Sequence, residues 1–528
     1  MRPSGRQGAA SPPASFADCW DRLARERGGD LALADARSAL TWRDAADLSR
    51  RLARGLLLFG LKAGEVVACW LPSWVDLYVL RIACERAGLI WLPIPAHLRE
   101  FEVQGILQRA EPSVLVIAEG FRDRDFVAAA GSLLLHLPRR PHLVISGGAR
   151  PAGELTLDQL AQRGDQASGL DFPAPASKDV WVILPTTGTT GLPKFAQFRV
   201  SAWLLRGQAQ TELLDLRSED VVVSLSSGIG PSIIPLFAAP LAGAPVRLVD
   251  QFEPGAVIEM FRRVQPTIAC GVPAQLTALV RHPGWPPETG LERIRIWYST
   301  GAACPQSTAE RLEATTRGIS LSGYGGMDFG GWAVPAPSDS RAIRYETVGR
   351  PRGHTELRLV DETGNTVPAG EVGEIWGRGP CCAEGYFRDE VATRERWTAD
   401  GWFRTGDLAR RDPSGNLVIM GRKGEVIRRG GRSIHPLEVE QLLGAHPKIA
   451  RVAIVGIPDP LLGEQACAFV VPRPDEVIEL TEVAAYLRAQ RIASFKIPER
   501  LVLLADLPSK GDKVDRLALR ETVSSPRH

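Results

Sequence analysis

Hydrophobic and polar residues are arranged in two different patterns along the first part of the chain. Residues 48–58 and 78–87 carry apolar side chains at helical spacing. Residues 66–71 and 89–94 form short apolar runs that are followed by proline, as buried strands often are. Helices that alternate with buried strands predict an α/β fold with a largely parallel sheet.

The pattern changes from about residue 355. Short alternating runs up to residue 422 are separated by Asp, Gly and Asn, which indicates an antiparallel subdomain. A helical pattern at 437–443 and strand-like runs at 452–455 and 466–471 follow. We therefore expect a disordered tail (1–15), a large N-terminal domain of α/β sheets with the antiparallel subdomain (16–421), and a small mobile α+β C-terminal lid (422–528).

Composition narrows the classes of function. A chain of 528 residues is long enough for at least two hydrophobic cores. Its 63 Lys and Arg nearly balance its 61 Asp and Glu, which disfavours nucleic acid or an anionic membrane as a partner. The eight cysteines show no CxxC spacing, so we expect buried thiols in a reducing compartment. No membrane span or signal peptide is recognisable, and we expect a cytoplasmic location.

A polar loop after the strand-like residues 180–184 carries the strongest chemical signal. Glycines let backbone N–H groups turn towards an anion, threonine hydroxyls add donors, and a lysine adds positive charge. The loop is not a Walker A motif, because Pro193 disfavours a helix there and residues 195–198 look like a strand. A polar surface hairpin is the alternative. The predicted phosphate-binding residues are Thr186, Thr187, Gly188, Thr189, Thr190, Gly191 and Lys194.

Further motifs follow this loop in a fixed order. They are VGRP at 348–351, GEI at 373–375, GYF at 385–387, GWFRTGDL at 401–408 and GR at 421–422. With these motifs the chain resembles the superfamily of acyl-CoA synthetases, peptide-synthetase adenylation domains and luciferases, over residues 38–519. The resemblance implies ATP-dependent activation of a small carboxylic acid as its acyl-adenylate, followed by acyl transfer to a thiol. It also implies ATP, Mg²⁺ and CoA as the cofactors.

The resemblance assigns roles to residues at the nucleotide. The phosphate loop would hold the β- and γ-phosphates. Asp328 stands where the family has a metal-ligating Glu, and Met327 replaces a Thr; a turn carboxylate is the alternative for Asp328. Asp407 would accept hydrogen bonds from the ribose hydroxyls. The remaining adenine and ribose residues would be Gly301, Ala302, Ala303, Tyr324 and Arg422.

The C-terminal part carries the catalytic lysine of the family. Lys513 precedes Val-Asp-Arg as the family's lysine does, although the loop is one residue shorter than usual; Lys510 is the alternative. Gly424 stands at the position of the family's hinge, with Glu425 as the alternative, and the small domain would rotate there between the two half-reactions. Gly430 and Gly431 would line the thiol tunnel. The basic residues around them would meet the CoA phosphates or form a solvated loop.

The acid pocket is the part that the sequence specifies least. The expected lining residues are Gly228, Ile229, Gly230, Gly325 and Trp332. They predict a roomy apolar pocket for an aromatic, alicyclic or medium-chain acid, and the lack of an Asp partner disfavours amino acids. Three hypotheses follow: a ligase that uses CoA, an enzyme that loads the phosphopantetheine thiol of a carrier protein, and a non-catalytic nucleotide-binding homologue.

Overall fold

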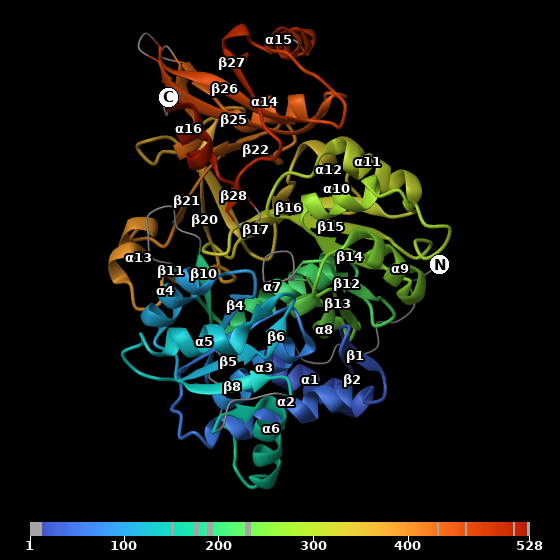
Figure 1. The fold of residues 1–528 in the computed structure, drawn as a ribbon, viewed down its shortest axis with the longest axis vertical. Coiled ribbons are helices and arrows are strands. Elements are labelled where there is room, and N and C mark those ends of the chain that lie inside the picture. Colours follow the sequence, from blue (N-terminus) through green and yellow to red (C-terminus); the bar gives the residue numbers. More distant parts are fainter. Residues whose placement is uncertain are drawn as a thin grey trace, which may run out of the picture.

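The computed structural model describes most of the chain. The described residues are 13–148, 153–173, 179–186, 194–226, 234–429, 432–459, 462–490, 492–510 and 513–524. Most of the expected tail therefore lies outside them. They form a large N-terminal α/β domain and a smaller C-terminal domain that lies at one end of it (Figure 1).

A seven-stranded sheet forms one layer of the N-terminal domain. Its neighbouring strands are parallel except for β10 and β11. All six positions of the central strand β3 are buried, which explains its unbroken apolar run. Across the sheet the strands are β11 (Lys194–Arg199), β10 (Val180–Thr186), β4 (Ile90–Pro95), β3 (Val66–Leu71), β5 (Val114–Ala118), β8 (His142–Ser146) and β9 (Leu155–Thr156). Its helices are α1 (Phe16–Glu26), α2 (Trp42–Leu57), α3 (Val75–Ala87), α4 (Glu100–Ala110), α5 (Phe126–Leu134) and α6 (Leu157–Gln166).

A nine-stranded sheet forms the second layer, and its central strands are parallel. Across it the strands are β18 (Arg350–Pro351), β17 (Trp332–Val334), β16 (Ile319–Gly325), β15 (Ile296–Thr300), β14 (Ile268–Gly271), β12 (Val222–Ser224), β13 (Val246–Leu248), β1 (Leu31–Ala34) and β2 (Ala39–Thr41). The helices are α7 (Val200–Leu213), α8 (Ala239–Ala242), α9 (Pro254–Val264), α10 (Pro273–Arg281), α11 (Gln306–Thr315) and α12 (Arg341–Glu346). Ligands of such sheets bind at the carboxyl ends of the strands, where β15 and β16 present their loops.

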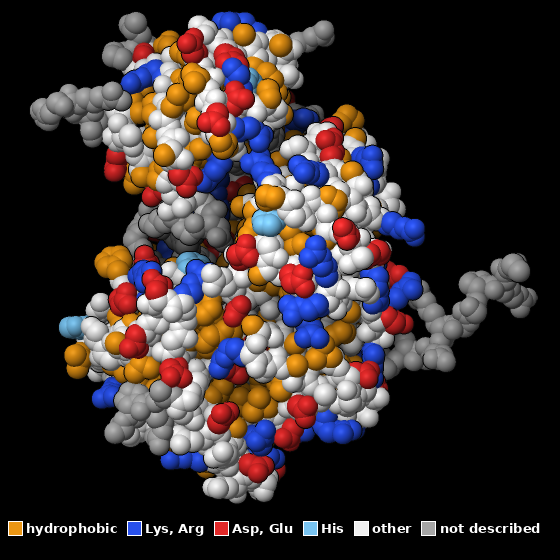
Figure 2. All heavy atoms as spheres, turned by 45° about the vertical axis from the view of Figure 1, so that its right-hand side comes forward, with side chains coloured by type: hydrophobic (Ala, Val, Ile, Leu, Met, Phe, Trp, Pro, Cys, Tyr) orange, Lys and Arg blue, Asp and Glu red, His pale blue; other side chains and the backbone are white. Residues whose placement is uncertain are grey.

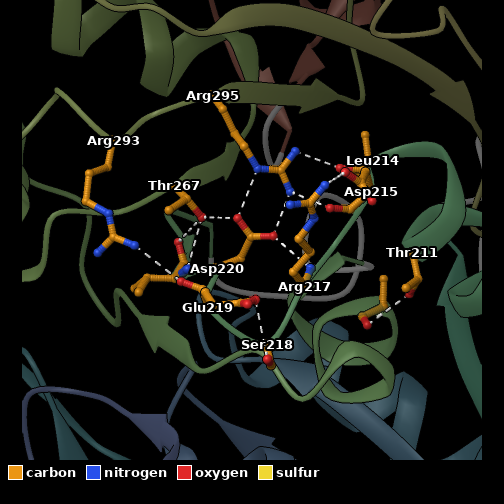
Figure 3. Close-up of polar contacts among 12 residues, drawn as sticks. Thr211, Leu214, Asp215, Arg217, Ser218, Glu219, Asp220, Thr267, Arg293 and Arg295 are labelled. Carbon is orange, nitrogen blue, oxygen red and sulfur yellow. Dashed lines mark hydrogen bonds and ion pairs between the residues drawn. The ribbon is translucent and has the colours of Figure 1, made fainter. Parts of the chain in front are cut away.

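A cluster of polar side chains links the strands of this sheet at their amino-terminal ends, on the side opposite to those loops (Figure 3). Asp220, Thr267 and Arg295 lie just before β12, β14 and β15. Asp220 accepts hydrogen bonds from Arg295 Nε at 2.9 Å and Nη2 at 2.6 Å, and from Thr267 Oγ1 at 2.7 Å. Although burial raises the pKa of Asp220, these bonds and one from the Arg217 N–H bring it below its usual value. The cluster joins three neighbouring strands and lies away from their carboxyl ends.

The rest of the chain forms two units, of which the first is an antiparallel sheet and the second contains a mixed sheet. The first is the sheet of β19 (Glu356–Val360), β20 (Gly373–Arg378), β21 (Phe403–Arg411) and β22 (Leu417–Arg422), with helix α13 (Glu390–Arg396). The C-terminal domain has its own hydrophobic core. It contains β23 (Ile427–Arg429), β24 (Arg432–Ile434), β25 (Ile449–Asp459), β26 (Gly463–Pro472), β27 (Arg500–Leu503), α14 (Pro436–Gly444), α15 (Leu480–Ala489), α16 (Arg516–Ser524) and the hairpin of β28 (Ser509–Lys510) and β29 (Lys513–Val514).

The predicted fold class is confirmed. The runs at 66–71 and 89–94 are strands β3 and β4, and residues 355–422 contain the expected antiparallel sheet. The proposed boundary between residues 421 and 422 stays a prediction. None of the helices in the described part of the chain combines the length and the apolar character needed to cross a bilayer.

Candidate active site

The site lies where the C-terminal domain meets the N-terminal domain. The face drawn in Figure 2 is hollowed at this junction, and Lys and Arg side chains gather beside the hollow. Figure 1 places β28 at the lower edge of the C-terminal domain, on the side of the N-terminal domain. Lys513 of the same hairpin interacts electrostatically with Asp407 and Asp328 of the N-terminal domain. The two domains therefore contribute to one site.

Tyr324, Asp407 and Arg422 form the first group of the site. Asp407 and Arg422 are direct partners in the ladder of β21 and β22. The Tyr324 hydroxyl donates to Asp407 Oδ2 at 2.8 Å, and Arg422 Nε lies 3.0 Å from Asp407 Oδ1. Burial raises the pKa of Asp407, and the positive charge of Arg422 opposes this. Both carboxylate oxygens thus face polar partners, and three of the predicted adenine and ribose residues lie together.

Lys513 approaches this group from the C-terminal domain. In the hairpin it pairs directly with Lys510. Its side chain is accessible to solvent, yet the surrounding protein desolvates the ammonium enough to lower the pKa of Lys513, and the charge of Arg422 lowers it further. Asp407, Asp328 and Glu425 act in the opposite direction. These acidic groups therefore offset burial and the charge of Arg422 only in part, and the pKa of Lys513 stays lowered.

Thr186, Lys194 and Asp328 lie at the predicted phosphate end. Thr186 and Lys194 pair across β10 and β11, and Thr186 Oγ1 donates to the Lys194 carbonyl at 3.2 Å. Asp328 Oδ2 accepts a hydrogen bond from the Tyr386 hydroxyl at 3.3 Å and lies 3.6 Å from Arg396 Nη2. The other predicted phosphate residues lie outside the described residues: Thr187, Gly188, Thr189, Thr190 and Gly191.

The turn after β15 carries the predicted adenine-binding residues Gly301, Ala302 and Ala303. Gly301 has a φ of +96°, which glycine adopts without strain. A Cβ at this position would approach only Val272 Cγ1, at 4.0 Å. Gly301, Ala302 and Ala303 are all exposed. The turn therefore leaves room for a flat ring beside the backbone.

Two of the five expected acid-pocket residues are described, and they are neighbours. Gly325 pairs with Trp332 across β16 and β17, and Trp332 is buried. Gly228, Ile229 and Gly230 lie outside the described residues. The sequence did not predict a role for Arg206 of α7, which is buried and donates to the Gly330 carbonyl. Its Nη2 lies 3.6 Å from the position that a Cβ of Gly325 would occupy.

The segment around the predicted hinge is anchored on both sides. Gly424 is the middle residue of a 3-10 turn, Lys423–Glu425, and a Cβ there would meet nothing within 4 Å. Lys423 Nζ lies 3.2 Å from Glu374 Oε2 in the N-terminal domain. Glu425 Oε2 lies 3.3 Å from Arg516 Nε in the C-terminal domain. Gly430 and Gly431, the predicted tunnel residues, lie outside the described residues.

Sequence reasoning missed three side chains of the site. Tyr386 lies inside the GYF motif but was given no role, and β11 positions it through the bridge between Ala196 and Tyr386. Glu395 and Arg396 at the end of α13 carry no recognisable motif. Only the three-dimensional structure brings them to Lys194 and Asp328.

Comparison with known proteins defines the family. Residues 20–387 match the family described as AMP-binding enzyme, and residues 438–512 match the AMP-binding enzyme C-terminal domain. The chain therefore belongs to the AMP-binding enzyme family. The resemblance to acyl-CoA synthetases and adenylation domains is confirmed. Membership supports AMP-forming ligation of an acid as the class of activity.

Several relatives align along nearly the whole chain. A salicylyl-CoA synthase / salicylate adenylyltransferase of Streptomyces sp is 34% identical over 97% of this chain and 94% of its own. A medium-chain fatty-acid–CoA ligase of Escherichia coli (strain K12) is 30% identical over 99% and 93%. Among solved structures, ATP-bound MatB from Rhodopseudomonas palustris has a TM-score of 0.83 at 25% identity, and covers 96% of this chain and 98% of its own.

Proposed function

We propose that this chain activates a small carboxylic acid with ATP and then transfers the acyl group to the thiol of CoA. In the first step a carboxylate oxygen attacks the α-phosphorus of ATP, which gives the acyl-adenylate and releases pyrophosphate. In the second step the thiol loses its proton to solvent, its sulfur attacks the acyl carbon, and AMP leaves with the electron pair of the broken bond. The observation that carries the proposal is the convergence of Lys513 with Asp407 and Asp328 across the domain junction.

The positive groups of the site suit the first step. Because two anions meet there, the reaction needs positive charge at the phosphates. Lys513 would stabilise the charge that develops on the α-phosphate, and Thr186 and Lys194 would hold the β- and γ-phosphates. Tyr324 would pack on adenine and Asp407 would accept the ribose hydroxyls.

Asp328 fits the requirements of Mg²⁺. Within the described ranges no three His, Cys, Asp or Glu side chains gather as a metal-binding group. A single partly exposed carboxylate is typical of Mg²⁺, which keeps several waters and shares its remaining positions with substrate phosphates. When bound, the ion would neutralise phosphate charge.

The acid is proposed to be aromatic, alicyclic or of medium chain length. The names of the relatives support this range, since they include salicylyl-CoA and medium-chain fatty-acid–CoA ligases. The pairing of Gly325 with the buried Trp332 is compatible with a flat or apolar acyl group.

A carrier-protein thiol is the second candidate acceptor. It is supported by the variety of relatives, because pyochelin synthase PchD of Pseudomonas aeruginosa is as similar, at 31% identity over 96% of this chain, as several CoA ligases. In either case we propose that Gly424 is the hinge and that Gly430 and Gly431 line the thiol tunnel.

The test is a panel of acids in an ATP–pyrophosphate exchange assay with Mg²⁺. The proposal expects acid-dependent exchange, with AMP and pyrophosphate as products. ADP as the main product would refute adenylation, and the absence of exchange with every acid of the panel would favour the non-catalytic homologue. Adding CoA or a phosphopantetheinylated carrier protein then identifies the acceptor.

A further inference from the structure

The last turn of α13 places two opposite charges beside the two ionic groups of the predicted MgATP site. Glu395 and Arg396 are consecutive and end the helix. Glu395 Oε2 lies 3.6 Å from Lys194 Nζ, and Arg396 Nη2 lies 3.6 Å from Asp328 Oδ2. The Glu395 carboxylate thus pairs with Lys194, the lysine proposed to bind phosphate. The Arg396 guanidinium pairs with Asp328, the aspartate proposed to bind the metal.

Tyr386 connects the two pairs. Its hydroxyl donates to Asp328, and Lys194 Nζ lies 5.4 Å from the centroid of its ring. The same ring packs edge-on against Trp397, the residue that follows α13, at 5.1 Å. Three of the four charged side chains, Lys194, Asp328 and Arg396, therefore interact with one buried tyrosine, and Trp397 packs the helix end against its ring.

We propose that Glu395 and Arg396 are internal counterions that hold Lys194 and Asp328 in the nucleotide-free enzyme and are exchanged for a phosphate oxygen and Mg²⁺ when MgATP binds. The proposal rests on the function proposed above. The Glu395 carboxylate takes the place of a phosphate anion, and the Arg396 guanidinium takes the place of the divalent cation. Without them, Lys194 and Asp328 would lose these two ion pairs in the nucleotide-free enzyme.

The exposure of the pairs makes such an exchange feasible. Glu395 is 64% exposed and its partner Lys194 23% exposed, so water screens this pair and it breaks readily. Asp328 and Arg396 are 25% and 34% exposed. An exposed ion pair contributes less than about 1 kcal/mol. The Glu395 pair should therefore weaken the binding of phosphate, and the Arg396 pair the binding of Mg²⁺, by about two- to fivefold each.

The same helix offers a matched control. Glu390 and Arg394 pair with each other at 3.2 Å, and both are strongly exposed. Glu390→Gln and Arg394→Met therefore change the charge of α13 by the same amount as Glu395→Gln and Arg396→Met do. They leave the Lys194 and Asp328 contacts in place, so long-range charge effects cancel in the comparison.

The experiment measures binding and not turnover. ATP is titrated by calorimetry into each variant without acid, first with EDTA and then with increasing Mg²⁺, after melting curves have shown that the variants are folded. We expect Glu395→Gln to bind metal-free ATP about two- to fivefold more tightly than Glu390→Gln. We expect Arg396→Met to need about two- to fivefold less Mg²⁺ than Arg394→Met for half-maximal enhancement of ATP binding.

Each other result has a distinct meaning. Equal or weaker ATP binding by Glu395→Gln would overturn the counterion role of Glu395. A higher Mg²⁺ requirement or weaker ATP binding in Arg396→Met would show that Arg396 is a direct phosphate ligand, which also overturns the proposal. If the parent protein binds no ATP with or without Mg²⁺, the proposed function itself fails. That outcome is separate from a failure of the variants alone.

Discussion

Replacing Lys513 by alanine should separate the two half-reactions. Lys513 reaches the site from a two-stranded hairpin, so its removal deletes one charge and little packing. The negative charge of the adenylation transition state develops at the α-phosphate, whereas thioester formation involves the acyl carbon and the thiol. We therefore expect Lys513→Ala to impair the first step and to spare the second.

The size of the defect follows from the surroundings of Lys513. Asp407, Asp328 and Glu425 favour its charged form, and we expect the ammonium to be in place before the reaction begins. Loss of one such preorganised donor costs about 10²–10³-fold in rate, or about 2.7–4 kcal/mol of transition-state stabilisation. Lys510→Ala, which changes the cross-strand partner, is the matched control and should be nearly neutral in both steps.

The assay measures each half-reaction alone. Acyl-adenylate formation is followed by pyrophosphate exchange, and transfer by adding synthetic acyl-adenylate and CoA to the same variants. A second readout is pH: because the pKa of Lys513 is lowered, adenylation should decline in alkali earlier than the ordinary pKa of lysine, about 10.4, implies. Lys513→Arg keeps its charge and should lose this decline.

Two results would refute this reasoning. If Lys510→Ala carries the adenylation defect, the catalytic lysine has been assigned three residues too late. If Lys513→Ala loses both half-reactions equally, the lysine supports the structure and does not act on the α-phosphate.

Three further predictions concern other parts of the chain. Asp328→Ala should depress adenylation and Asp328→Glu should retain most of it; parental activity of the alanine variant at limiting Mg²⁺ would rule out the metal role. Gly424→Pro should adenylate but fail in transfer, because proline fixes φ, whereas Gly424→Ala should be tolerated since a Cβ has open space. Asp220→Asn should lower the free energy of unfolding by about 1.5–3 kcal/mol with little effect on turnover. Because the pKa of Asp220 is lowered, its contribution to stability is present above the unfolded pKa and is lost as pH falls through the folded pKa, which acid titration of unfolding will test.

Local patterns were sufficient to predict much of the fold. The strand at 66–71 is buried on both faces, so all its residues are apolar and the run could be recognised in the sequence. The Asp, Gly and Asn turns after residue 355 predicted the antiparallel sheet in the same way. The site residues that lie in motifs, such as Asp407 and Tyr324, were predicted together because the resemblance to the family assigns both of them to the nucleotide. The roles assigned to them stay predictions.

Contacts between segments that are distant in the sequence could not be predicted from any local pattern of residues. Arg206 lies in an otherwise apolar stretch of α7, and only the three-dimensional structure shows that it reaches Gly330 and the side of Gly325. Glu395 and Arg396 look like ordinary surface charges of a short helix. Their positions depend on how α13 packs beside the end of β11, which no local pattern specifies.

The ion pairs on either side of Gly424 indicate where a rotation would begin. Lys423 is bound to Glu374 of the N-terminal domain, whereas Glu425 is bound to Arg516, just after the Lys513 hairpin. Arg516 also pairs with Glu440 of α14 at 2.7 Å, so the hairpin, α14 and Glu425 are connected within the C-terminal domain. A rotation that keeps these pairs must turn the chain between residues 423 and 425. The same rotation would withdraw Lys513 from Asp407, and this coupling supports Gly424 as the hinge in preference to Glu425.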